Sequence, residues 1–163
     1  MNTIIQLPAA ISGYGKIQEE VAPERFKNYL KGLPLTLLDF QSFQQEPNYS
    51  YMLGLLLDAE QQKFYYFFCN KYYPYIACAE IKEMAETRIT PHLLVNQFVD
   101  LTEVKDPEGY FTILPVYFLE KKVTSDELLI SHILQHLEHQ EFAEFAYWEP
   151  RILANIIFNR WEK

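Results

Sequence analysis

The chain has 163 residues, of which 49% are hydrophobic and 22% are charged, values that predict one folded domain over residues 1–163 and exclude a disordered chain. Twenty-two acidic residues against 14 basic ones give a formal net charge of −8. A negative surface repels phosphate groups, so we expect no binding to nucleic acid or to anionic membranes. A basic protein is the partner that this charge favours, mainly through faster encounter.

Cellular location is indicated by the cysteines and by the first residues. Cys69 and Cys78 are the only cysteines, and the start MNTIIQLPAA lacks the basic and apolar regions of a signal peptide. The longest apolar runs, such as Tyr51–Leu57, are far too short to span a bilayer. We therefore expect a cytoplasmic protein whose two thiols are free, buried among apolar neighbours and unreactive.

The N-terminal part combines a short strand, a loop and a helix. Thr3–Leu7 is apolar enough for a first strand, and the glycine-containing stretch Ile11–Glu20 is typical of a loop. Pro23 suits the first helical position, and Gly32 with Pro34 ends the pattern, which predicts a helix from Pro23 to about Leu33. Its apolar stripe has the spacing i, i+3, i+4, i+7 and consists of Phe26, Tyr29, Leu30 and Leu33.

Four strands are predicted next, over Leu35–Phe40, Ser50–Asp58, Lys63–Asn70 and Tyr75–Ile81. The second and third are joined by a short polar loop, which predicts an antiparallel hairpin. Both of its arms are apolar on both faces, which is typical of central strands covered on each side or of strands with a face that awaits a partner.

The remainder predicts one more strand and several helices. We expect a short helix over Pro91–Phe98, a turn at Asp106–Gly109 and a strand over Tyr110–Glu120. A capping box at Thr124 starts a helix whose buried stripe is Ile130, Ile133, Leu134 and Leu137. Further helices are expected over Phe142–Tyr147 and after Pro150. The predicted fold is α+β: an antiparallel sheet of about four to six strands, an N-terminal helix and two or three C-terminal helices.

The most unusual stretch is FYYFFCNKYYPY, residues 64–75, in which eight of twelve side chains are aromatic. Tyrosine buries its ring while its hydroxyl seeks water or a partner, so this many tyrosines suggests a half-buried face suited to recognition. The predicted partner-binding residues here are Tyr65, Tyr72, Tyr73 and Tyr75. The alternative is that helices cover both faces of the sheet and the rings belong to the core.

Charge singles out a second candidate surface. From Val123 to Pro150 the sequence has six acidic residues and no lysine or arginine. Three of them, Glu138, Glu141 and Glu144, are predicted to attract a basic partner, and the alternative is an ordinary solvated helix face.

His132 and His136 are weak candidates for a metal site, because two histidines at i, i+4 can bind zinc. The HExxH pattern is absent and no distant cysteine or histidine pair completes a site. Exposed, metal-free histidines are therefore expected, as is a protein without a cofactor.

No catalytic signature is present: the sequence contains no GxSxG, and neither cysteine has a histidine partner implied by sequence. The composition favours an acidic protein-binding or inhibitor module, and bacterial immunity proteins that neutralise basic nuclease toxins are an analogy of this physical kind. One alternative is a small-ligand-binding protein or enzyme with an aromatic-lined pocket on the sheet. Another is a homodimer or larger assembly in which the aromatic hairpin pairs with its own copy.

Overall fold

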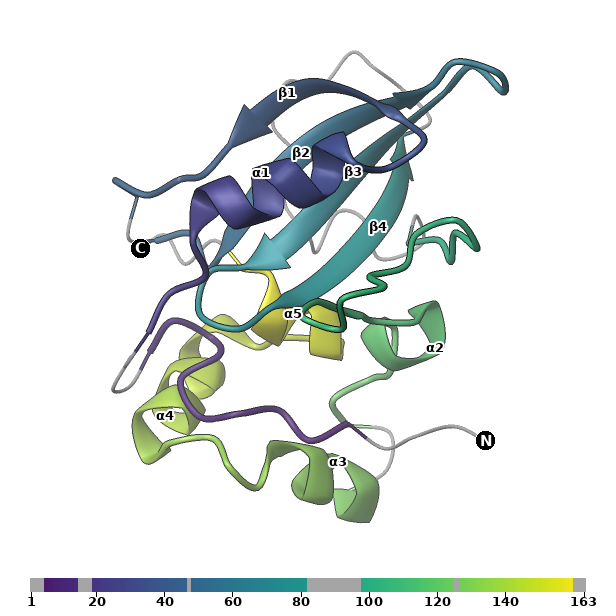
Figure 1. The fold of residues 1–163 in the computed structure, drawn as a ribbon. Helices are drawn as coiled ribbons and strands as arrows, with labels where there is room; N and C mark the ends of the chain where they lie inside the picture. The colour runs from purple at the N-terminus through teal and green to yellow at the C-terminus, as the bar shows by residue number, and fades with distance from the viewer. Residues whose placement is uncertain (1–4, 15–18, 47, 82–97, 125–126, 160–163) are drawn as a thin grey trace.

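The computed structural model describes residues 5–14, 19–46, 48–81, 98–124 and 127–159. Its centre is a sheet of five strands in the order β1-β2-β3-β4-β5 (Figure 1). The strands are β1 (Thr36–Gln41), β2 (Tyr51–Asp58), β3 (Lys63–Asn70), β4 (Tyr75–Ile81) and β5 (Thr112–Ile113). Neighbours from β1 to β4 are antiparallel, whereas β5 runs parallel to β4, so the sheet is mixed rather than purely antiparallel.

The predicted hairpin is confirmed over its full length. β2 and β3 pair without a break from Tyr51 opposite Asn70 to Asp58 opposite Lys63. β1 is less regular, since a bulge interrupts its pairing with β2 between Leu37 and Asp39. A bulge of this kind bends an edge strand and hinders pairing with another chain.

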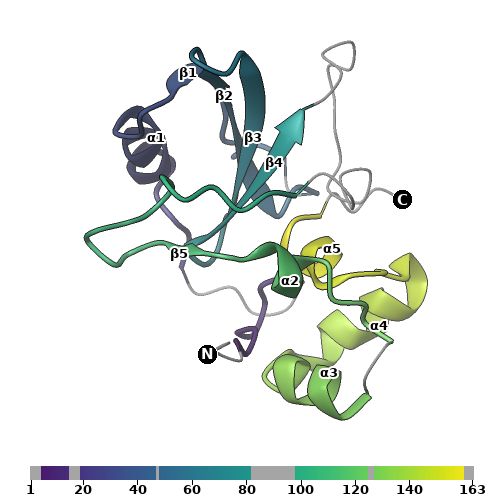
Figure 2. The ribbon, with the colours of Figure 1, turned by 90° about the vertical axis from the view of Figure 1, so that its right-hand side faces the viewer.

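Helices cover both faces of the sheet, which confirms the α+β class (Figures 1 and 2). The helices are α1 (Pro23–Lys31), α2 (Val116–Leu119), α3 (Glu127–Leu134), α4 (His139–Trp148) and α5 (Leu153–Ile157). α1 packs on the face that carries Phe67 and Cys69, and the C-terminal helices pack on the face that carries Tyr66 and Phe68. Alternate side chains of β3 therefore enter two separate cores, which explains why this strand is apolar on both sides.

The residues of the buried stripe predicted for the first C-terminal helix, Ile130, Ile133, Leu134 and Leu137, are all buried, but α3 ends at Leu134 and Leu137 follows it. That helix starts at Glu127, and the two residues that follow Thr124 lie outside the described part. None of the helices in the described segments is long and apolar enough to cross a membrane.

The strand expected over Tyr110–Glu120 is wrong. Only Thr112 and Ile113 pair with β4, and α2 begins at Val116, with Pro115 as its N-cap. The N–H groups of Thr112 and Leu114 donate to the carbonyls of Pro74 and Ile76, but the next donor in this series, Val116 N, donates to Asp100 Oδ1. The next carbonyl on that edge, Cys78 O, accepts from Val99 N, so the pairing cannot extend further.

Two further predictions fall partly outside the described residues. Of Thr3–Leu7, residues 3 and 4 lie outside, and Ile5–Leu7 is not a strand; Leu7 donates its N–H to the carbonyl of Ile133 in α3. Of the helix expected over Pro91–Phe98, only Phe98 is described, and it forms an isolated antiparallel bridge with Ala79.

The N-terminal segment, residues 5–14, runs as an irregular strap along α3 and α4 (Figure 1). Polar side chains from distant parts of the chain hold its backbone. Asn70 Nδ2 donates to the Ile11 carbonyl over 2.9 Å, and Asn159 Nδ2 donates to the Ser12 carbonyl over 3.1 Å. These contacts satisfy backbone groups that have no partner in a helix or sheet.

Candidate functional site

The hairpin tyrosines divide into buried and half-buried groups. Tyr65 is 4% exposed and packs in the core under α1, so the expectation that its ring is accessible is wrong. The reason is the covering helix: the β3 face that carries Tyr65 also carries Phe67 and Cys69, and α1 closes over it. For this ring, the alternative that it belongs to the core is what the structure shows.

Tyr72, Tyr73 and Tyr75 lie at the turn between β3 and β4 and are half-buried. The hydroxyl of Tyr73 donates to the Ala9 carbonyl over 2.6 Å, and its ring stacks beside that of Tyr75 with centroids 6.4 Å apart. Burial raises the pKa of all three hydroxyls, so they remain neutral at physiological pH. At least Tyr73 therefore helps to hold the N-terminal segment.

Glu141 is fully buried, which contradicts its predicted place on an accessible acidic surface. Its carboxylate accepts hydrogen bonds from Ala10 N (2.6 Å), Ser12 N (3.1 Å), Ser12 Oγ (2.6 Å) and Glu138 N (3.0 Å). The first three donors belong to the N-terminal segment and the fourth lies at the start of α4. Glu141 thus fastens the segment to the helix, and its charge is stabilised by donors rather than by a cation.

Glu138 and Glu144, the other two predicted acids, are half-buried beside α4. Glu144 Oε2 accepts from Trp148 Nε1 over 3.2 Å, one turn further along the helix. The three glutamates therefore do not form one exposed patch, because the one in the middle points inward.

The outward side of α4 was not recognised from the sequence as a surface. Phe142 is 42% exposed and Tyr147 is 64% exposed, and Ala143 and Ala146 between them are exposed as well. These four residues, which we call the α4 face, share one side of the helix because 3.6 residues complete a turn. The sequence does show these four apolar residues at the helical spacing i, i+1, i+4, i+5. However, Phe145 and Trp148 form a second apolar side of the same helix, and the sequence alone does not decide which of the two sides faces solvent.

His132 is exposed on α3 and His136 is exposed in the turn that follows this helix, so the two do not share one helix as expected; both contact the side chain of Gln6. The Gln6 Nε2–His132 Nε2 distance is 3.3 Å, and the distance from His136 Nε2 to Gln6 Oε1 is 3.2 Å. Within the described ranges, no group of three histidine, cysteine, aspartate or glutamate side chains is arranged to hold a metal ion. The pair contacts the N-terminal segment through Gln6.

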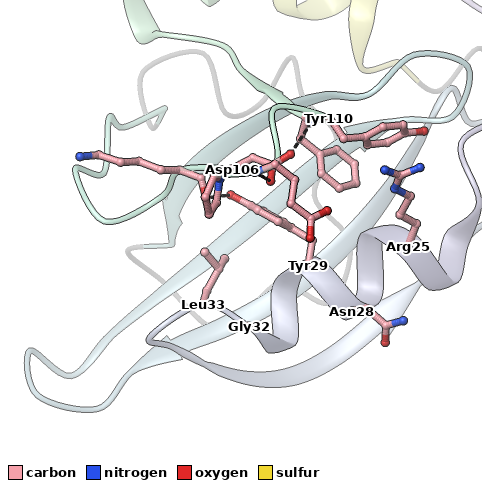
Figure 3. Close-up of a pocket in the computed structure, with 11 residues that line it drawn as sticks. Arg25, Asn28, Tyr29, Gly32, Leu33, Asp106 and Tyr110 are labelled. Carbon is pink, nitrogen blue, oxygen red and sulfur yellow. Dashed lines mark hydrogen bonds between the residues drawn. The ribbon is translucent and has the colours of Figure 1, made fainter.

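A cavity of about 380 Å³ opens between α1 and the turn that follows Val104 (Figure 3). Its lining includes Arg25, Tyr29, Tyr110 and Phe111 but none of the tyrosines of the aromatic hairpin. This cavity beside α1 is therefore a different place from the aromatic-lined pocket that was expected on the sheet.

Comparison with protein-family models, with curated proteins and with solved structures gives no match.

The two thiols offer little chemistry. Cys69 and Cys78 are buried on the same side of the sheet as α1, and burial raises the pKa of both well above the ordinary value. The free, buried state expected from the sequence is confirmed, and a buried neutral thiol is a poor nucleophile. Two accessible features of the described residues are the α4 face and the cavity beside α1.

Proposed function

We propose that this chain is a protein-binding module that captures a basic partner through the α4 face. The observation that carries the proposal is the exposure of Phe142 and Tyr147 in the stretch from Val123 to Pro150, which contains no lysine or arginine. Large aromatic side chains are frequent anchors of protein interfaces, because they offer wide contact area with few rotatable bonds.

The surroundings of the α4 face match an acidic recognition surface. Glu138 and Glu144 are half-buried at its margins, and Glu149 is exposed where the helix ends. With a net charge of −8 and no lysine or arginine on this helix, the face attracts cations and repels other acidic proteins. Such charge accelerates encounter, while the aromatic side chains slow dissociation.

A toxin-neutralising inhibitor is the specific form that we favour for this module. Enzymes that act on nucleic acid have basic surfaces, since they bind phosphates. An acidic protein with an aromatic anchor is physically suited to cover such a surface. The partner class is therefore a basic protein such as a nuclease.

The test begins with a partner identified by affinity capture and then measured in purified form by surface plasmon resonance. The double variant Phe142→Ser/Tyr147→Ser is expected to weaken binding by thirtyfold or more, in line with about 2 kcal/mol for an interface anchor. Tyr117→Ser is the matched control, because Tyr117 is also an exposed aromatic but lies on α2. Raising the salt concentration is expected to slow association.

Three results would overturn the proposal. The first is a captured partner that is acidic, and the second is equal weakening by the control and the double variant. The third is a dimer of this chain in light scattering that the double variant abolishes, which would assign the α4 face to self-association.

A further inference from the structure

The cavity beside α1 has the features of a small-molecule site. α1 supplies one wall, and the turn from Lys105 to Phe111 supplies the other (Figure 3). Its volume of about 380 Å³ lies near the lower end of the range that ligand sites occupy. We propose that this cavity binds a small carboxylate with a flat apolar body, such as an aromatic acid. This inference concerns a surface other than the α4 face and does not depend on the proposed function.

The walls suit a flat apolar group. The rings of Tyr29 and Phe111 are 5.0 Å apart, and Tyr110 stands nearly perpendicular to Phe111 with centroids 4.8 Å apart. The Tyr29 hydroxyl donates to the Lys105 carbonyl over 3.0 Å, and burial raises its pKa, so this phenol carries no charge. This hydrogen bond ties α1 to the turn, so the two walls are held together before a ligand arrives.

Arg25 provides the anion-binding group. Its guanidinium lies over the Tyr110 ring, 3.4 Å from the centroid, and Figure 3 shows it directed toward that ring. Among the described residues Arg25 forms no ion pair, since the one pair found there joins Lys63 and Glu80. Stacking occupies a face of the guanidinium and leaves its in-plane N–H groups available for bidentate contact with a carboxylate.

The acidic residues in the lining do not cancel this preference. Asp106 uses both oxygens inside the turn: Oδ2 accepts from Phe111 N over 2.6 Å and Oδ1 from Glu108 N over 3.1 Å. Its carboxylate is therefore committed to shaping the wall. The lining contains two bases, Arg25 and Lys105, and two acids, Asp106 and Glu108, so the formal charges balance here although acids dominate the whole chain.

The test is a titration of the ¹⁵N-labelled full chain, followed by two-dimensional NMR, with sodium benzoate as the probe. Saturable shifts are expected at millimolar benzoate for amides of α1 and of residues 105–111. Benzamidine, which has the same ring and a positive charge, is the charge-reversed control and is expected to leave these amides unchanged. Absence of saturable shifts with benzoate, or tighter binding of benzamidine, would overturn the proposal.

Substitutions on α1 test whether Arg25 is the group that binds the carboxylate. Arg25→Gln is expected to weaken benzoate binding at least tenfold, and Arg25→Lys, which keeps the charge but loses the fork, is expected to weaken it less. Lys31→Gln is the matched control, because Lys31 is a base on the same helix outside the lining. If Lys31→Gln weakened binding as much as Arg25→Gln, the effect would be one of general charge and the assignment of Arg25 would be wrong.

Discussion

Glu141→Ala is the substitution whose cost follows most directly from the structure. It removes a fully buried carboxylate that accepts from Ala10 N, Ser12 N, Ser12 Oγ and Glu138 N. The serine hydroxyl can rotate to another partner, but the three backbone N–H groups cannot. Alanine therefore leaves these donors without their acceptor at the junction of α4 and the N-terminal segment.

The expected loss of unfolding free energy is about 3–5 kcal/mol. A buried donor left without an acceptor costs about 1–3 kcal/mol, so three of them would cost about 3–9 kcal/mol if nothing relaxed. Water entry and local rearrangement reduce the sum, and single substitutions seldom exceed about 5 kcal/mol. Against a typical total of about 5–15 kcal/mol, the variant would be folded but marginal.

The assay is urea unfolding at pH 7, followed by far-ultraviolet circular dichroism. Glu144→Ala is the matched control, because it removes the same group from the same helix and disturbs the hydrogen bond from Trp148 Nε1. We expect the control to cost about 1 kcal/mol, the usual worth of one hydrogen bond. The reasoning is refuted if Glu141→Ala unfolds within about 1 kcal/mol of the unaltered chain, or if both variants cost the same.

Three further predictions use the same unfolding measurement. Gly54→Ala would drive its new Cβ into Leu30 Cδ1 between β2 and α1, and is expected to cost about 1–3 kcal/mol; an unchanged midpoint would contradict this packing. Gly109→Ala meets no atom within 4 Å, so its expected cost of about 1–2 kcal/mol comes from the backbone angle φ of +73° alone. Burial raises the pKa of Cys69 and Cys78 from the ordinary 9.0, so above pH 9 the unfolded chain loses protons that the folded chain keeps. Stability is then expected to fall by about 1.4 kcal/mol per pH unit for each thiol, and alanine at both positions should make that fall shallower.

Strand positions in the centre of the sheet were predictable because the apolar composition of each strand and the polar turns on either side indicate the same bounds. β3 and β4 have the expected bounds, and β2 differs by one residue, since each is a continuous apolar run between polar turns. The strand expected over Tyr110–Glu120 failed because α2 begins at Val116, whose N–H donates to Asp100 Oδ1 instead of to β4. No local pattern reports that the side chain of residue 100 captures the N–H of residue 116.

The candidate site was less predictable, for a reason visible in the glutamates of α4. Glu138, Glu141 and Glu144 are alike in sequence, yet only Glu141 meets a segment that lies some 130 residues earlier in the chain. Tyr65 differs from Tyr75 in the same way, since the helix that covers Tyr65 belongs to another part of the chain. Charge and aromatic content are visible in the local sequence, but the exposure of a side chain depends on which distant elements pack against it.

The fastening of the N-terminal segment also constrains the order in which the protein can mature on the ribosome. Residues 10 and 12 are made well before their carboxylate acceptor at position 141 and the amide at position 159. Translation must therefore have passed position 159 before all these contacts can form, even though the meander from β1 to β4 is already complete. A nascent chain halted after β4 could hold the N-terminal segment only through residues such as Asn70 and Tyr73, and one face of its sheet would be uncovered, which is the kind of apolar surface that chaperones bind.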